Sequence, residues 1–333
     1  MFSFFNNLNY ILPPSFFDFL NLTYSFSAKV VGLIALFLLL RTLIVFLKTQ
    51  KLFKNRRSIN IKSLKKLASK AGKGLPFFTV LVPARNEADV VEATIKTLSK
   101  LDYPNNKYEI IIVTDEKELI YNNGEVTTQE VIEKAIIDIK KKKPNLKVSY
   151  INVVNDFDGK FLGKCTGKEV KSTKGRALNY VLTEYYSEFK DKTDFFAFFD
   201  TDDHPSKKCL IEIARSYLED EKNQVFQLPV YQCRNLFDIN AFNKVVALGQ
   251  CFTHENFLPY TMKWLPFLGG TNLFISKDVL FLVEGFSCDS ITEDLDLGVE
   301  IYLRTGYWPQ FLPLPSSEQT PGTFKAYYRQ RHR

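Results

Sequence analysis

The hydrophobic and polar positions from residue 75 onward alternate between short apolar runs and longer amphipathic stretches. Four apolar runs predict buried strands, and a helical pattern follows each of them. The predicted strands are "FFTVLVP" (77–83), "YEIIIVTD" (108–115), "KVSYINVV" (147–154) and "DFFAFFD" (194–200). The predicted helices are 87–101, 128–142, 177–189 and 207–218. This alternation indicates an α/β fold, a mainly parallel sheet with helices on both faces.

Carboxylates follow two of these strands, at the edge where an open parallel sheet binds its ligands. Asp115 ends the second strand, and Asp200, Asp202 and Asp203 follow the fourth. Residues two apart in an extended segment point to the same side, so Asp200 and Asp202 should converge while Asp203 turns away. Like charges this close repel unless a cation or a substrate offsets them. The sequence therefore predicts a ligand site at this edge.

The spacing of Asp200 and Asp202 suits a hard divalent cation, Mg²⁺ or Mn²⁺, which completes its shell with water and phosphate oxygens. A solvated turn with an Asp helix cap is the alternative for these residues taken alone. A phosphatase of the haloacid dehalogenase type also carries a DxDx[TV] motif after a strand. His204 stands at the last position of that motif here, which disfavours the phosphatase.

The N-terminal part of the chain has a different pattern. Residues 30–47 are 18 residues in which only Arg41 and Thr42 are polar. That length is near the lower end of the range for a transmembrane helix, and a buried core helix is the alternative. Residues 1–29 before it form a predicted extracytoplasmic or interfacial segment.

The positive charge of the chain is local. The formal net charge is +7, yet residues 48–73 alone hold ten Lys and Arg and no acid, so the rest carries 7 − 10 = −3. This distribution argues against a nucleic-acid partner. Basic residues directly after a span mark its cytoplasmic side. We therefore expect a basic linker at 48–74 and a cytoplasmic domain at 75–333, anchored to the plasma or inner membrane.

The five cysteines are odd in number, widely spaced and form no CxxC pair. This usage predicts a reducing compartment and argues against both a disulfide framework and a zinc site.

Seven short motifs occur in order along the predicted domain. They are "VPARNEA" (82–88), "VTDE" (113–116), "KGRALNY" (174–180), "DTDD" (200–203), "FLGGTNLFI" (267–275), "ITEDLDLG" (291–298) and "RQRHR" (329–333). In order and spacing the series resembles the family 2 glycosyltransferases of GT-A fold. It is most similar to the membrane-integrated, often processive branch that includes cellulose, hyaluronan and chitin synthases. The resemblance covers about residues 76–333 and implies a Rossmann-like GT-A domain behind an N-terminal transmembrane helix.

The resemblance implies a nucleotide-sugar site built from several strand ends. Its residues would be Pro83, Asn86, Glu87, Asp115, Lys174 and Asp200. Asp115 would contact the base and ribose, and Lys174 the donor phosphates, with a solvated loop lysine as the alternative for Lys174. Asp200 and Asp202 match the metal-binding pair, with Asp202 as the direct ligand. Many members have DDG or DDS where this chain has "TDE", which leaves the role of Glu116 open.

The resemblance also implies an acceptor side. Asp294 matches the general base of the "TED" triplet, and the matching acceptor residues are Gly269, Gly270, Asn272, Glu293, Gln330 and Arg333. Glu293 and Asp294 also fit first-turn acids that complement a helix dipole, with Ser290 and Glu293 as a capping box. Both interpretations can hold together.

These matches predict an inverting transferase that moves a sugar from a UDP- or GDP-sugar to a glycan or lipid acceptor. Tyr231, Phe257, Tyr260 and Trp264 are candidates for stacking on sugar rings, with ordinary packing as the alternative. Residues 236–264 are expected to form an amphipathic helix at the bilayer surface.

Two alternatives from other classes are a metal-dependent nucleotidyltransferase and a catalytically inactive membrane scaffold. The presence of Asp115, Asp200, Asp202 and Asp294 disfavours the scaffold.

The last expectation concerns the end of the chain. In the resembled family a Trp follows the element that Gln330 and Arg333 match. We therefore expect the gene to continue past residue 333 with a Trp codon and further apolar spans.

Overall fold

The computed structural model describes residues 14–54, 58–120, 124, 126–162, 164–165, 173–288, 290 and 292–331. They belong to two compact units, Met1–Lys54 and Asn55–Arg333. Each unit is described here by itself.

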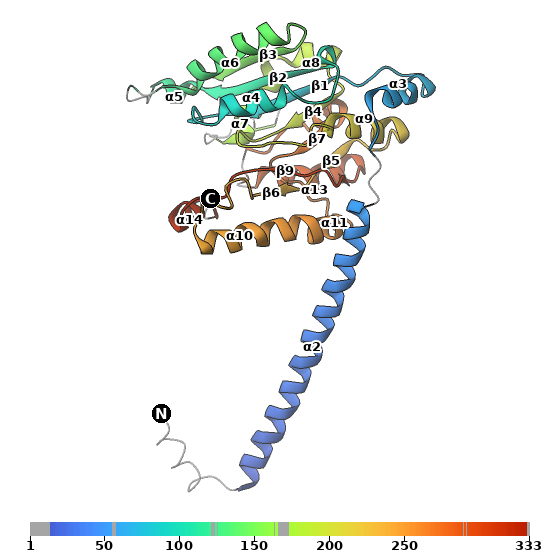
Figure 1. The fold of residues 1–333 in the computed structure, drawn as a ribbon, viewed down its shortest axis with the longest axis vertical. Helices are drawn as coiled ribbons and strands as arrows, with labels where there is room; N and C mark the ends of the chain where they lie inside the picture. Colours follow the sequence, from blue (N-terminus) through green and yellow to red (C-terminus); the bar gives the residue numbers. More distant parts are fainter. Residues whose placement is uncertain are drawn as a thin grey trace. The chain divides into compact units, whose positions relative to one another are not determined.

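The first unit is one long helix, α2 (Pro14–Lys54), which is longer at both ends than the expected span at 30–47 (Figure 1). Within it, Asn21–Lys54 is the one segment of the described residues that is long and apolar enough to cross a membrane. At 1.5 Å per residue these 34 residues extend about 50 Å, against about 30 Å for a hydrocarbon core. The expected linker at 48–74 is partly helical, because α2 continues to Lys54 and α3 (Ile61–Lys70) follows.

The second unit is built on a seven-stranded sheet in the order β3-β2-β1-β4-β7-β5-β8 (Figure 1). Its strands are β1 (Phe78–Pro83), β2 (Tyr108–Asp115), β3 (Lys147–Val153), β4 (Phe195–Phe198), β5 (Val225–Gln227), β7 (Leu273–Ser276) and β8 (Gln310–Phe311). The strands β3, β2, β1 and β4 are parallel, whereas β7 runs antiparallel to both β4 and β5. A separate pair joins β6 (Val230–Tyr231) to β9 (Ser316–Ser317). The fold is therefore a mixed, mainly parallel α/β sheet.

Alternate residues of the central strands enter two different cores, as the period of a strand requires. In β4, Phe195 belongs to one core cluster and Phe196 to the other. The first core is covered by α3, α4 (Val91–Leu98), α6 (Thr128–Lys142) and α9 (Cys209–Glu219). The second is covered by α7 (Lys174–Glu184), α8 (Tyr186–Lys192), α12 (Lys277–Leu282) and α13 (Glu293–Thr305). Helices on both faces bury the central strands completely.

The remaining elements are short or lie outside these layers. They are η1 (Asn105–Lys107), α5 (Glu116–Ile120), α10 (Ala241–Phe252), the π-helix η2 (Thr253–Phe257), α11 (Leu258–Thr261) and α14 (Phe324–Arg331). The amphipathic helix expected at 236–264 is thus three consecutive helical pieces. The helix expected at 177–189 starts earlier, at Lys174, and divides at Tyr185 into α7 and α8.

The cysteine prediction was wrong in one respect. Cys165 and Cys288 form a disulfide, with their Cα atoms 5.9 Å apart and a sequence separation of 123. Cys209, Cys233 and Cys251 are free thiols. The spacing of the cysteines along the sequence did not indicate this bond, because only the fold brings the two segments together.

Candidate active site

The parallel half of the sheet gathers the predicted donor residues at one edge. Pro83 at the end of β1 pairs with Val113 of β2, two residues before Asp115. On the other side of β1, Leu81 pairs with Phe198 of β4, two residues before Asp200. Since all three strands are parallel, their carboxyl ends meet, and Asp115 and Asp200 follow on either side of β1.

Asp200 is held from three directions. Its backbone N–H donates to Thr271 Oγ1 at 2.9 Å and to Asp203 Oδ2 at 3.1 Å. Its carboxylate forms an ion pair with Lys174, whose ammonium also donates to the Gly270 carbonyl. Burial alone would lower the pKa of Lys174, but Asp200 outweighs it and the pKa is raised. Lys174 therefore remains a fixed positive charge beside Asp200.

Asp202 is anchored by two segments that are distant in sequence. Its Oδ2 accepts the backbone N–H of Gln319 at 3.3 Å, and its carbonyl accepts the Arg234 guanidinium at 2.8 Å. Burial raises the pKa of Asp202; the Gln319 hydrogen bond opposes this, and repulsion from Asp200 adds to it. The two carboxylates of the DxD pair thus repel each other, as the sequence predicts for a cation site.

Asp203 turns into the interior, as expected, and is fully buried. Its Oδ2 accepts from the Asp200 N–H and from the Thr271 hydroxyl. Glu318, directly after β9, is 7% exposed. Burial, then the charges of Asp203, Asp200 and Asp202, raises the pKa of Glu318 to about 10. Glu318 was missed by the sequence analysis, because a lone Glu in a loop gives no signal until the fold buries it among other carboxylates.

Asp294 and Lys174 both lie close to Gly270. A Cβ atom built on Gly270 would lie 3.2 Å from Asp294 Oδ2 and 3.6 Å from Lys174 Nζ, so both side chains flank this glycine. The neighbouring Gly269 donates its N–H to Gln227 Oε1 at 2.7 Å. The glycine pair lets the two charged groups approach the same stretch of backbone closely.

Helix α13 carries Glu293 and Asp294 in its first turn. Burial, together with the charge of Asp294, raises the pKa of Glu293, although its own backbone N–H opposes the shift. The N-cap is Thr292 rather than Ser290, and it makes no side-chain cap hydrogen bond within the described residues. The capping box considered for Ser290 and Glu293 is therefore not what starts this helix.

Arg176 is a second residue that the sequence analysis did not single out, although it lies inside the "KGRALNY" motif. It is 1% exposed, and its Nη1 lies 3.6 Å from Asp115 Oδ2. Its other nitrogens donate to the carbonyls of Phe157 at 2.8 Å and Val154 at 2.7 Å. Arg176 thus fixes the end of β2 to the loop that follows β3.

The first loop lies near the DxD pair. Asn86 has φ 57°, a left-handed conformation that Asn tolerates, and its N–H donates to Glu118 Oε2 at 2.9 Å. Glu87 donates its N–H to Thr128 Oγ1 at 2.8 Å. Burial, then repulsion from Asp202 and Asp200, raises the pKa of Glu87. Glu116, whose role was open, accepts the Asn155 N–H at 3.1 Å.

Not every predicted residue faces this site. Asn272 is fully buried, and its amide donates to the carbonyl of Pro229 at 3.1 Å. Gln330 lies in α14, but its side chain is outside the described part, and Arg333 lies outside the described residues altogether. Among the aromatic candidates, Trp264 is 76% exposed.

The arrangement fits a divalent cation only with help from a substrate. Within the described residues, no group of three or more His, Cys, Asp and Glu is placed to hold a metal ion. Asp200 and Asp202 nevertheless supply two mutually repelling carboxylates. Such a pair suits Mg²⁺ or Mn²⁺ when phosphate oxygens and water complete the shell.

Comparisons with known proteins agree with this geometry. Residues 195–333 match the family model "Glycosyl transferase family group 2". A probable glycosyltransferase of Bacillus subtilis, YdaM, is 26% identical over 270 residues, covering 78% of this chain and 55% of YdaM. A beta-monoglucosyldiacylglycerol synthase of Nostoc is 24% identical over 232 residues, covering 69% of this chain and 42% of the synthase. The chain thus spans about half the length of the curated relatives it matches.

The fold also matches a solved structure. A mannosyltransferase of Pyrobaculum calidifontis, solved with GDP-Man and Mn²⁺, superposes with a TM-score of 0.50 at 16% identity, covering 87% of this chain and 71% of the mannosyltransferase. This similarity confirms the predicted GT-A type of α/β fold.

Proposed function

We propose that this chain, which belongs to the family 2 glycosyltransferases, transfers a hexose from a nucleotide-sugar donor to a lipid acceptor at a membrane. The observation that carries the proposal is the juxtaposition of two charged groups at Gly270. Lys174, paired with Asp200, and Asp294 both lie beside the position that a Cβ of Gly270 would take. A donor diphosphate and an acceptor hydroxyl need this combination of charges within one site.

On the donor side, Asp115 is assigned to the base and ribose, and Pro83, Asn86 and Glu87 to the loop beside the nucleotide. Lys174 offsets the charge that develops on the departing diphosphate, since the ion pair with Asp200 holds its ammonium in place. Asp202, with Asp200, would hold a Mg²⁺ or Mn²⁺ ion. When bound, such an ion supplies Lewis-acid stabilisation of the leaving group.

On the acceptor side, Asp294 accepts the proton of the attacking hydroxyl. General-base catalysis of this kind contributes typically about 10²–10⁴-fold. Gly269 and Gly270 leave room for the acceptor beside the base, and the half-buried carboxyl of Glu293 adjoins it. A single displacement at the anomeric carbon inverts its configuration, so an α-linked donor gives a β-linked product.

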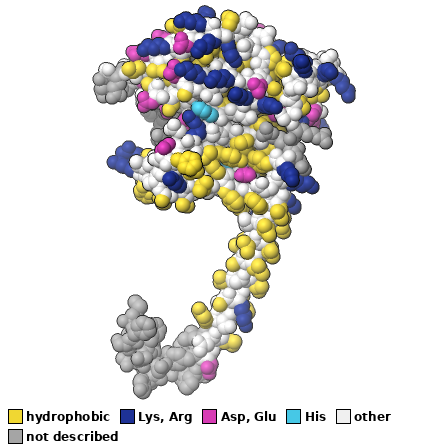
Figure 2. Space-filling model, viewed as in Figure 1, with side chains coloured by type: hydrophobic (Ala, Val, Ile, Leu, Met, Phe, Trp, Pro, Cys, Tyr) yellow, Lys and Arg dark blue, Asp and Glu magenta, His cyan; other side chains and the backbone are white. Residues whose placement is uncertain are grey.

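Two observations favour a lipid over a growing glycan as the acceptor. The Nostoc relative is named for making a glucosylated diacylglycerol. In addition, α10 exposes a row of apolar side chains spaced three to four residues apart, as one helix face requires (Figure 2). This row, the α10 patch, consists of Phe242, Val245, Leu248 and Phe252. Such a face suits the bilayer interface, where an acceptor lipid is available to the site.

The α10 patch continues onto α14. The ring of Phe242 packs edge-on against Phe324 at 5.3 Å and against Tyr327 at 5.9 Å. Phe324 is itself 60% exposed. Together with the apolar α2, these surfaces support attachment to the cytoplasmic side of a membrane. The expected likeness to processive polysaccharide synthases remains a prediction.

The test uses the full chain in nanodiscs that contain diacylglycerol. UDP-glucose, UDP-N-acetylglucosamine and GDP-mannose, each labelled in the sugar, are offered with Mn²⁺ and with a chelator. We expect release of nucleoside diphosphate and labelled lipid with one donor, and loss of both with the chelator. Labelled glycan without labelled lipid would contradict the acceptor class. Transfer of the nucleotide itself would favour the nucleotidyltransferase.

A further inference from the structure

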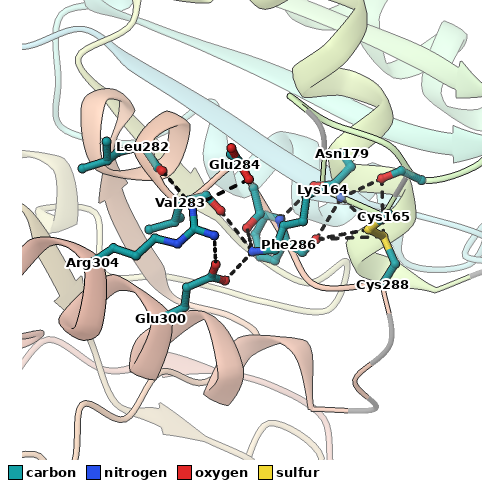
Figure 3. Close-up of polar contacts among 12 residues, drawn as sticks. Lys164, Cys165, Asn179, Leu282, Val283, Glu284, Phe286, Cys288, Glu300 and Arg304 are labelled. Carbon is teal, nitrogen blue, oxygen red and sulfur yellow. Dashed lines mark hydrogen bonds and ion pairs between the residues drawn. A yellow bond between two sulfur atoms is a disulfide. The ribbon is translucent and has the colours of Figure 1, made fainter. Parts of the chain in front are cut away.

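A cluster outside the proposed catalytic residues connects the two helices that carry Lys174 and Asp294. It consists of Lys164, Cys165, Asn179 and Cys288, and we name it the α13 clamp (Figure 3). All four residues contact residues 283–288 or lie within them, and this segment leads into α13. The segment also touches α7, because a Cβ on Gly175 would lie 3.2 Å from both Phe286 Cβ and the Ser287 carbonyl.

Lys164 holds this segment and α13 at the same time. Its ammonium donates to the carbonyls of Val283 and Gly285, each at 3.1 Å, and forms an ion pair with Glu300 of α13. Its side chain is only 15% exposed, so water screens these contacts weakly. Figure 3 shows the lysine reaching both the backbone of the segment and Glu300, which also pairs with Arg304 at 2.9 Å.

Asn179 of α7 fixes the middle of the segment. Its amide nitrogen donates to the Phe286 carbonyl at 3.0 Å, and its amide oxygen accepts the Phe286 N–H at 2.9 Å. The glycine before Phe286 has φ 77°, and a Cβ there would lie 2.6 Å from Asn179 Oδ1. Asn179 and Gly285 therefore fit each other so closely that neither leaves space for another side chain.

The disulfide holds the segment nearer to the catalytic helix. Cys288 lies five positions before Glu293, the first residue of α13, whereas the hydrogen bonds of Asn179 and Lys164 end at Phe286 and Gly285. Within the described residues, the start of α13 has no side-chain cap. Leu297 and Ile301 pack α13 into the second core, and the helix is further held by tethers from outside it. Two of them, the ion pair with Glu300 and the disulfide, come from the adjacent residues Lys164 and Cys165.

We propose that the α13 clamp positions Asp294. We further propose that how firmly the clamp holds the start of α13 depends on the redox state of the Cys165–Cys288 disulfide. The inference rests on the proposed function for its effect on catalysis, but the clamp itself is tested without catalysis. A disulfide in a cytoplasmic domain is usually transient, catalytic or redox-sensing. Cys288 is half-buried and Cys165 is 9% exposed, so Cys288 is the more accessible residue for exchange.

The redox step is ordinary thiol–disulfide exchange. A small dithiol such as dithiothreitol attacks Cys288 Sγ as a thiolate, releases the Cys165 thiolate, and then displaces Cys288 by closing its own disulfide. Two electrons and two protons pass from the dithiol to the two cysteines. Oxidised glutathione reverses the step and leaves as two thiols. With the bond open, we expect the start of α13 to move while Lys164 and Asn179 still hold residues 283–286.

The test compares the full chain in nanodiscs after treatment with oxidised glutathione or with dithiothreitol. Counting alkylated thiols by intact mass establishes the state of the bond. Hydrogen exchange over residues 292–305 then reports on the first turns of α13, and transfer assays give kcat and the donor KM. We expect faster exchange and an about tenfold lower kcat in the reduced form, with the donor KM unchanged.

The variants Cys165→Ser and Cys288→Ser should reproduce the reduced state and lose the response to oxidant. Cys251→Ser, which removes a thiol elsewhere, should keep that response. Lys164→Met should speed exchange in the same peptides, whereas its neighbour in sequence, the exposed Lys160→Met, should not. Equal exchange over residues 292–305 in the two redox states would overturn the proposal. If exchange differs but no donor is used, the clamp stands and the proposed function fails.

Discussion

The proposed donor side and the proposed acceptor side of the site are built on different principles. On the donor side, Asp115 and Asp200 follow parallel strands whose ladders fix their backbone at the edge of the sheet. On the acceptor side, Asp294 stands at the start of a helix that has no side-chain cap within the described residues; core packing, an ion pair and a disulfide in the preceding segment hold this helix. The two sides meet at the glycine-containing backbone around Gly270 and where Gly175 approaches Glu293.

This difference between strand ends and a helix start indicates where the site is rigid and where it is adjustable. A strand end moves only if the sheet moves, because each residue shares its hydrogen bonds with two neighbouring strands. A helix start held by a few side chains can shift when one of them is lost. Donor binding should therefore be insensitive to changes that impair the acceptor side, and the predictions below test this separation.

The largest expected effect separates the two carboxylates that serve the two sides. Asp294→Asn should lower kcat by about 10²–10⁴-fold, because no group then accepts the acceptor proton. Nucleotide affinity in the presence of Mn²⁺ should stay close to that of the wild type. Asp202→Asn should instead abolish the Mn²⁺-dependent part of nucleotide binding. Calorimetric titration of nucleotide with and without Mn²⁺ measures both, and equal loss of binding in the two variants would refute the separation.

A smaller effect compares one ion pair from each side. Arg176→Met leaves the buried Asp115 without its guanidinium, which should cost roughly 3–5 kcal/mol of unfolding free energy and weaken nucleotide binding. Arg304→Met removes a pair whose arginine side chain is 43% exposed, and should cost about 0–1 kcal/mol. Denaturant unfolding of the full chain in detergent gives both values. Similar losses would mean that the donor side is no more rigid than the acceptor side.

The smallest effect concerns the buried carboxyl next to the DxD pair. Folded Glu318 keeps its proton to about pH 10, whereas the unfolded chain releases it near the ordinary glutamate pKa of 4.5. The folded state thus binds more protons between these values, and stability falls as the pH rises through this window. Glu318→Gln should remove this slope, so the variant should lose less stability than the wild type between pH 5 and pH 8. Melting curves at pH 5 and pH 8 measure it, and an unchanged slope would contradict the expectation.

The sequence was most informative where structure is local and periodic. The limits of β2 and α6 were predicted to the residue, since β2 is a continuous apolar run and α6 has Thr127 as an N-cap that bonds the Glu130 N–H. The strands that precede Asp115 and Asp200 followed from the same pattern. Their meeting at one edge then followed from the parallel topology, which the structure confirms.

The remaining features of the fold and the site depend on tertiary contacts, which no short stretch of the sequence determines. The strand β7 has four residues and runs antiparallel between β4 and β5, so its direction is set by its partners. The ion pair between Arg176 and Asp115 joins two residues that are 61 positions apart in the sequence. The pKa of Glu318 is raised because the fold buries this residue beside Asp203. The roles assigned to individual site residues remain predictions from the motif series.

The bond between Cys165 and Cys288 also divides the chain mechanically. It closes a covalent ring between two cysteines with a sequence separation of 123, and this ring includes the DxD pair and Gly270. A protease or translocase that pulls on either end cannot lengthen this ring. The applied force therefore does not extend this part of the chain, which would measure roughly 400 Å if fully stretched. A translocase that starts from the C-terminus would reach the cross-link at Cys288, and one that starts from the N-terminus would reach it at Cys165. At that point two polypeptide segments would lie side by side. With the bond closed, the DxD pair and Gly270 thus lie in the part of the chain that pulling on the ends does not extend.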